Sequence, residues 1–276
     1  VLLLCLGWGL LLLAANARLF SLRFLSTSYS NSPAGLFLAV LLALALWLAW
    51  KPVRVLARAG EIFRLALAVG LAFSLALGAF QIEPRHVLPI WTEDVPGLLS
   101  AALPVLGLLG YGLFAAFLGG NVTRTENDRR CLLVWGTVFC LVLTALQLVC
   151  QGNFGPTLTA RADTPFFLMV KGIGIEGTFQ RVESLIIALW VFSDLALLAL
   201  LASSCAALAQ AVFSLKERRH AAVPVVALAL AGAWLLFPDA FSLDRWMENV
   251  VWPGNLLLGF GLPVLLLLVK KLRGQV

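Results

Sequence analysis

The chain has 276 residues, of which 61% are hydrophobic and only 12% charged, and its formal net charge at pH 7 is +6. A soluble globular domain carries about 25% charged residues because its surface faces water. This composition therefore excludes an ordinary soluble enzyme or soluble binding module. The apolar residues come in blocks of about 17 to 20, the length that a helix needs to cross a hydrocarbon core about 30 Å thick.

The apolar blocks show no alternation of polar and apolar residues, which a membrane β-barrel would show over strands of about ten residues. The sequence therefore predicts an all-α polytopic membrane protein surrounded by a lipid bilayer. Eight apolar runs are expected to cross the membrane within a single bundle that occupies residues 1–276. The runs cover about 1–25, 34–50, 62–80, 97–118, 131–150, 182–213, 221–238 and 250–269. The connection 151–180 is the longest, and its Gly-Pro and Thr-Pro steps suggest an ordered lid or a re-entrant segment.

The basic residues lie mainly in the short connections between runs, so the net positive charge is a signal of topology and predicts no nucleic-acid partner. Lys and Arg gather after the second, fourth, sixth and last runs, and the positive-inside rule places these connections and the C-terminus in the cytoplasm. Arg18 and Arg23 fall on the other side, where we expect their side chains to snorkel to the interface. The chain starts at Val1 within an apolar run and without Met, so we expect an N-terminal part to be missing.

The fourth run concentrates helix-breaking residues near its middle. Pro104 removes a backbone donor, and the glycines that follow each weaken a helix by about 1 kcal/mol. Because freed backbone groups in lipid need other partners, one prediction is an unwound helix whose half-helix ends bind the carboxylate and ammonium groups of a small substrate. The alternative is close helix packing through small residues. The candidate ligand-binding residues here are Gly107, Gly110, Tyr111 and Gly112.

Asp194 lies well inside the sixth run, where an aspartate facing lipid would cost about 2.5–3.5 kcal/mol. We therefore expect it to face the bundle interior, either as a proton or substrate contact or as an interhelical hydrogen bond. Glu183 lies eleven residues earlier, about three helical turns, and points the same way. Arg181 and Glu183 are predicted to form a gating or anchor pair near the outer mouth. Asn16, at the end of the first run, is a further candidate ligand-binding residue.

The sequence contains no pattern typical of a metal site, a phosphate-binding loop or a catalytic nucleophile. His86 and His220 lie in connections and lack metal-type partners, and the five cysteines mostly lie in apolar runs without ligand spacing. We therefore predict no cofactor, no metal and no enzymatic activity.

Several segments resemble the endospore germination permeases. A proline-led amphipathic stretch runs into Arg181-Val182-Glu183 and then into an apolar helix that bears Trp190. Further similar segments are residues 57–63 (Ala-Arg-Ala-Gly-Glu-Ile-Phe), 87–90 (Val-Leu-Pro-Ile), the glycine-bearing fourth run, and 255–265, which begin with Asn255 and contain Gly-Phe-Gly-Leu-Pro.

The resemblance implies the B subunit of a spore germinant receptor (GerAB-like), within the amino acid–polyamine–organocation superfamily. Such proteins have ten helices in a LeuT-like five-plus-five inverted repeat, with the first and sixth broken around the ligand. On this map the eight runs are helices three to ten, and the fourth run is the broken sixth helix.

The resemblance further implies a nutrient ligand, namely an amino acid, together with A-type and lipoprotein C-type partner subunits. It also implies a location in the inner membrane of a spore-forming bacterium. Two alternatives stay open: a proton-coupled amino-acid transporter of the same superfamily, with Asp194 or Glu183 as the proton carrier, and a scaffold subunit without a ligand.

Overall fold

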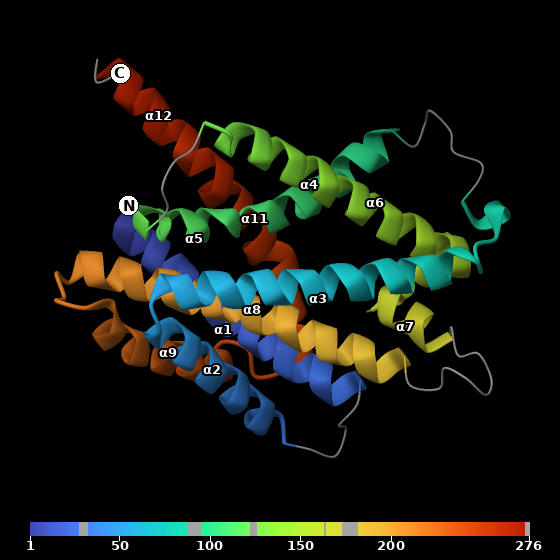
Figure 1. The fold of residues 1–276 in the computed structure, drawn as a ribbon, viewed down its shortest axis with the longest axis horizontal. Helices are drawn as coiled ribbons and strands as arrows, with labels where there is room; N and C mark the ends of the chain where they lie inside the picture. Colours follow the sequence, from blue (N-terminus) through green and yellow to red (C-terminus); the bar gives the residue numbers. More distant parts are fainter. Residues whose placement is uncertain (28–32, 88–94, 122–125, 163, 173–181, 274–276) are drawn as a thin grey trace. The chain divides into compact units, whose positions relative to one another are not determined.

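The computed structural model describes residues 1–27, 33–87, 95–121, 126–162, 164–172 and 182–273, and every regular element in these ranges is helical (Figure 1). The longer helices are α1 (Leu2–Thr27), α2 (Ala34–Trp50), α3 (Val53–Ala79), α4 (Val95–Leu109), α6 (Asp128–Arg161), α8 (Val182–Val212), α9 (Arg218–Leu235) and α12 (Leu262–Leu272). Shorter helices are α5 (Gly112–Ala116), α7 (Pro165–Gly172), α10 (Ala240–Trp246) and α11 (Trp252–Leu256). The predicted all-α class is confirmed.

Six helical segments among the described residues are long and apolar enough to cross a membrane. They are Leu2–Leu25, Val53–Ala79, Leu99–Ala116, Asp128–Arg161, Ala188–Val212 and Ala240–Leu272. The two other predicted runs are also helical. One is α2, which is apolar but shorter, and the other is α9, whose first turn carries Arg218, Arg219 and His220. The five-plus-five repeat remains a prediction from the resemblance.

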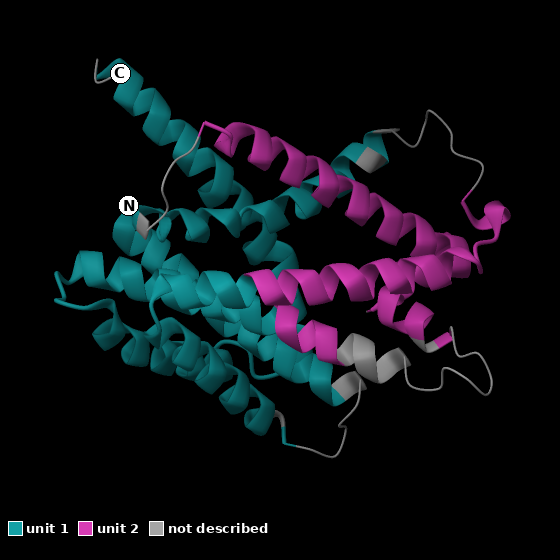
Figure 2. Ribbon diagram, in the orientation of Figure 1, with its two compact units in different colours: residues 1–60, 96–122, 194–276 teal, residues 61–95, 123–193 magenta. Residues whose placement is uncertain are grey.

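The chain forms two compact units, coloured separately in Figure 2. Unit 1 contains residues 1–60, 96–122 and 194–276, and unit 2 contains residues 61–95 and 123–193. Helices α3 and α8 each supply residues to both units.

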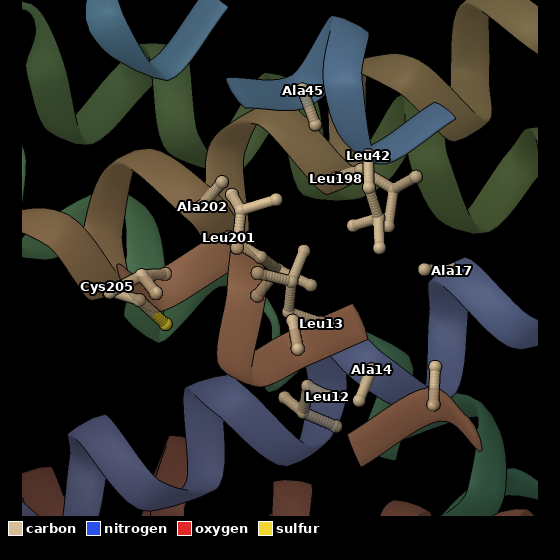
Figure 3. Close-up of a cluster of buried hydrophobic side chains, with 14 of the residues drawn as sticks. Leu12, Leu13, Ala14, Ala17, Leu42, Ala45, Leu198, Leu201, Ala202 and Cys205 are labelled. Carbon is tan, nitrogen blue, oxygen red and sulfur yellow. The ribbon is translucent and has the colours of Figure 1, made fainter. Parts of the chain in front are cut away.

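The core of unit 1 is built from small and branched apolar side chains. In Figure 3, side chains of α1, α2 and α8 converge, and in each helix large leucines alternate with alanines. This mixture lets helices approach closely while still filling the space between them, because interiors are packed as densely as organic crystals. The labelled core residues are Leu12, Leu13, Ala14, Ala17, Leu42, Ala45, Leu198, Leu201, Ala202 and Cys205.

The core of unit 2 lies between α6, α7, the part of α3 in this unit and the first turns of α8. Its buried members are Val149, Cys150, Met169, Val170 and Leu189. Close packing again depends on glycine: a Cβ at Gly78 would lie 2.6 Å from Val149 and 2.8 Å from the Met169 sulfur.

Helix α6 continues beyond the predicted end of the fifth run, through residues 151–161. The side chain of Asn153 donates to the carbonyls of Gly78 and Val149, at 3.0 and 2.7 Å, and so ties this extension to the end of α3. A kink at Gly155, which has φ 74° and ψ 166°, separates the last turns from the rest. The predicted connection is therefore partly helical, with α7 following in the same stretch and residues 173–181 outside the described ranges.

Candidate functional site

The fourth run is broken where Pro104 and the glycines predict it. Helix α4 ends at Leu109 and α5 starts at Gly112, with a turn at Gly110 and Tyr111 between them. The amide of Gly110 donates to the carbonyl of Gly107 at 3.1 Å, and the amide of Tyr111 donates to Leu108 at 3.3 Å. These bonds reach back three residues instead of four, so the break is a tight turn whose amides bond locally.

The broken segment packs directly on the last helical run of the chain. A Cβ at Gly107 would lie 2.9 Å from the carbonyl oxygen of Trp252, and one at Gly110 would overlap the carbonyl oxygen of Asn255. From the other side, a Cβ at Gly259 would lie 2.5 Å from the Cα of Gly110. The two explanations of these glycines therefore coexist here, since the helix is interrupted and its glycines also allow backbone-to-backbone contact.

Four polar side chains form a chain of contacts at this break. The Asn16 side-chain amide donates to the Tyr111 hydroxyl at 2.9 Å and to the Leu12 carbonyl at 2.8 Å. The Tyr111 hydroxyl also interacts with the side chain of Asn255. The indole N–H of Trp8 donates to the Asn255 Oδ1 at 2.9 Å. We call Trp8, Asn16, Tyr111 and Asn255 the polar chain; it lies within unit 1 and joins α1, the break and α11.

Asn255 is held between two π turns. Residues Met247–Val251 and Leu257–Gly261 adopt this wider turn, one on each side of α11. Each π turn directly precedes a helix that carries proline near its start, Pro253 or Pro263. A proline lacks the amide donor and clashes with the carbonyl four residues earlier, so a wider turn accommodates it. Such turns occur often at functional sites.

Asp194 faces the interior of unit 1, as predicted, and is 5% exposed. Its Oδ1 lies 3.8 Å from Nη1 of Arg23, and it makes no hydrogen bond to the polar chain among the described contacts. The structure therefore places this candidate in an ion pair with Arg23.

The structure says less about the three remaining candidate site residues. Gly112 is exposed, and a Cβ there would meet nothing within 4 Å. Arg181 lies outside the described residues, and of Glu183 only the backbone, in α8, is described. The gating or anchor pair therefore stays a prediction.

Sequence reasoning did not select Trp8 or Asn255 as site residues. The signal for Asn255 was available, because an uncharged polar side chain inside an apolar run needs a partner in lipid. Trp8 carried no such signal, since its role depends on a residue 247 positions away.

The snorkelling of Arg18 to the membrane interface stays a prediction, but the contacts of its side chain are described. Arg18 is 4% exposed, and its side chain donates from Nε to the Phe237 carbonyl at 3.0 Å and from Nη2 to the Pro238 carbonyl at 2.8 Å. Both carbonyls lie in the connection between α9 and α10, and the sequence pattern of α1 alone does not reveal this contact.

An all-α chain with several helices of membrane length, one of them broken beside buried polar side chains, is a polytopic membrane protein. A sequence profile described as "Spore germination protein" matches residues 1–238, and the chain belongs to this family. The family consists of membrane proteins that are not known enzymes.

A curated relative is YfkT of Bacillus subtilis (strain 168), which is assigned by its name to spore germination. It is 24% identical over 166 residues, which cover 58% of this chain and 44% of the relative. The match therefore spans less than half the length of that relative. No solved structure matches the chain.

Proposed function

We propose that this chain is the membrane-embedded nutrient-sensing part of a spore germinant receptor, and that its ligand is a small amino acid. The observation that carries the proposal is the polar chain at the break between α4 and α5. Buried polar groups in lipid are costly and mark functional positions, and membership of the spore germination family supplies the biological setting.

The chemistry of the polar chain suits a zwitterion. The side chains of Asn16 and Asn255 each carry a carbonyl acceptor and amide donors, and the Tyr111 hydroxyl both donates and accepts. Acceptors of this kind bind an ammonium group, while the donors bind a carboxylate. A ligand that exchanges these bonds for its own would favour one arrangement of α1, the break and α11 over another, and partner subunits would respond to that shift.

The setting of the receptor follows from the resemblance and the charge pattern. We expect the inner membrane of a spore-forming bacterium, with A-type and lipoprotein C-type subunits as partners. The basic residues Lys270, Lys271 and Arg273 at the end of α12 support a cytoplasmic C-terminus.

The test uses spores that carry the full-length gene as the source of this receptor. Asn16→Ala removes the bond to the Tyr111 hydroxyl, and Tyr111→Phe removes the contacts of that hydroxyl with Asn16 and Asn255. Both variants are expected to raise the nutrient concentration for half-maximal germination about tenfold, equivalent to about 1.4 kcal/mol. The matched control is Asn249→Ala, because Asn249 is exposed and donates only to the Arg245 carbonyl within its own run. Spores lacking the gene that still germinate on every nutrient, in a strain that no longer imports one amino acid, would contradict the proposal.

A second candidate function is proton-coupled amino-acid transport. The observation that favours it is Asp194, a buried carboxylate on α8 that lies 3.8 Å from the guanidinium of Arg23. This function predicts proton-driven uptake by the full-length protein in vesicles, abolished by Asp194→Asn. Uptake that is unchanged in this variant would make Asp194 a structural residue.

A further inference from the structure

Arg18 is a buried cation with incomplete bonding. Its Nε and Nη2 groups donate to the carbonyls of Phe237 and Pro238, whereas Nη1 is buried and has no hydrogen-bond partner. Arginine has five N–H donors in a rigid planar fork and keeps its charge at any physiological pH. The two N–H groups on Nη1 therefore lack acceptors, and the guanidinium does not lose its charge by deprotonation.

The charge of Arg18 is also only partly balanced. The two carbonyls follow the C-terminal end of α9, where the helix dipole contributes about half a negative charge. Among the described residues, no carboxylate lies within 4 Å of the guanidinium. Asp239 interacts with it electrostatically at longer range, but the Asp239 carboxylate is itself engaged, because its Oδ1 accepts from the Ser242 amide at 2.6 Å. A buried guanidinium inside an apolar unit calls for an anion to complete its bonding.

The cover over this guanidinium is a side chain that can move. The Trp234 ring lies over Arg18, with 5.0 Å between its centroid and Cζ, and Trp234 is 50% exposed. Its neighbour on α2 is Gly35, where a Cβ would lie 3.0 Å from the ring. Trp234 is not part of the buried core of unit 1, so a change of its rotamer leaves that core intact and exposes the face of the guanidinium that the ring covers.

We propose that Arg18 is a carboxylate-binding position, at which Nη1 receives the carboxylate of a small molecule when the Trp234 ring swings aside. This position differs from the polar chain, because Arg18 and Asn16 are two residues apart on α1 and so project about 200° apart around the helix. The inference rests on the proposed function in one respect only, which is that the carboxylate belongs to an amino acid.

Binding to the purified full-length protein in nanodiscs of zwitterionic lipid tests this assignment, since such discs offer no anionic headgroup. The probes are acetate, propionate and butyrate with the matching alcohols, and the twenty amino acids with the amines that lack the carboxylate. In the wild type, loss of the carboxylate is expected to weaken binding about tenfold to a hundredfold, as for a hydrogen-bonded charged group. In Arg18→Gln the difference between each simple acid and its alcohol is expected to disappear, whereas the amino acids keep the share that the polar chain contributes.

The matched control is Arg218→Gln. Arg218 also donates to main-chain carbonyls, those of Ala49 and Lys51, and also has a buried Nη1 without a partner. It differs from Arg18 in burial, because Arg218 as a residue is only half-buried. The acid-to-analogue difference is expected to stay at its wild-type value in this control. If Arg18→Gln fails to fold, Arg18→Lys serves instead, since it keeps the charge and loses the fork, and it is expected to retain part of the difference.

The outcomes separate the two proposals. An undiminished difference between the simple acids and their alcohols in Arg18→Gln, or no binding of any carboxylate to the wild type, overturns the role of Arg18. Simple carboxylates that bind through Arg18 as tightly as any amino acid support the position and contradict the amino-acid receptor.

Discussion

The two units differ in what they bury. Nearly all the buried polar side chains of the described residues lie in unit 1: Asn16, Arg18, Ser21, Asp194, Ser203, Ser204 and Asn255. Unit 2 buries Ser74, whose hydroxyl donates to the Gly70 carbonyl of its own helix at 2.7 Å. Unit 2 is held by apolar packing, backbone geometry and side-chain bonds that end on main-chain carbonyls, such as those of Asn153. In unit 1, buried polar side chains of different helices also bond to one another.

This difference indicates where function lies. A hydroxyl bonded to its own helix satisfies itself locally and specifies nothing about neighbours. A side chain such as Asn16 or Ser204 reaches another element, and Ser204 donates to the Phe114 carbonyl in α5 at 2.7 Å. Buried bonds of that kind link α1, α8 and α11 to the broken helix, so a change at one of these elements is felt by the others.

The largest effect is expected for Gly110→Ala in unit 1. The added Cβ would overlap a main-chain carbonyl of Asn255, and backbone cannot move aside as a side chain does. We expect a loss of about 3 kcal/mol in the free energy of unfolding, the upper end of ordinary overpacking, measured by thermal unfolding in nanodiscs. Gly112→Ala is the control, because a Cβ there has open space. Equal losses in both variants would mean that the turn between α4 and α5 does not touch α11 at this point.

Next in size is Gly155→Ala, which tests the claim that unit 2 depends on backbone geometry. The φ of 74° and ψ of 166° belong to a region almost restricted to glycine, and a residue with a Cβ there costs about 2 kcal/mol. The control is Gly136→Ala in the same helix, where nothing lies within 4 Å and alanine gains up to about 1 kcal/mol of helix propensity. A neutral result at Gly155, read by the same unfolding assay, would show that the kink is dispensable.

Two substitutions that each remove one buried polar side chain compare the free energies of unfolding of the two units directly. Asn255→Leu leaves the Trp8 indole N–H without its acceptor and is expected to cost about 1 to 2 kcal/mol. Ser74→Ala removes a bond within one helix and is expected to stay within about 0.5 kcal/mol. Both values come from unfolding of the full-length protein. Similar costs at the two positions would remove the distinction between the units.

The smallest effect concerns Asp239, outside the membrane-length segments. Hydrogen bonds from the amide and side chain of Ser242 lower the pKa of this carboxyl below its ordinary value. Because the folded pKa is the lower one, the stabilisation is present above the unfolded pKa of about 4 and is lost as the pH falls through the folded pKa. The midpoint of thermal unfolding should therefore fall in acid below about pH 4 by a small amount, and this part of the fall should be absent in Asp239→Asn. An identical acid profile for the two proteins would assign the fall to other groups.

The sequence predicted the helices well because long apolar runs leave little choice in lipid. The bounds of α2 and α8 match the predicted runs within a residue or two, and the break near Gly110 follows from proline and glycine chemistry. Helix α6 was predicted too short, since its last turns are held by Asn153 against α3, a contact that hydropathy does not contain.

The site was predicted only in part, for a related reason. Asn16, Gly110 and Tyr111 were selected from local features, and the structure brings them together. Their partners Trp8 and Asn255 lie at opposite ends of the chain. Which residues meet depends on how each helix is rotated about its axis, and the periodicity of apolar residues alone does not determine that rotation. For Asp194, interior placement followed from the cost of burying charge, but the pairing with Arg23 did not.

The π turns around α11 have a consequence for how this protein tolerates change in length. Each one accommodates roughly one surplus residue, and one residue rotates everything that follows by about 100° around the helix axis. Removal of one residue from Met247–Val251 would restore an ordinary α-helix there and swing Asn255 away from Tyr111, with little loss of apolar surface. The same deletion in Leu257–Gly261 would leave Asn255 in place and turn only α12. Two single-residue deletions, one in each π turn, therefore distinguish the effect of turning Asn255 from the effect of shortening the helical run that carries it.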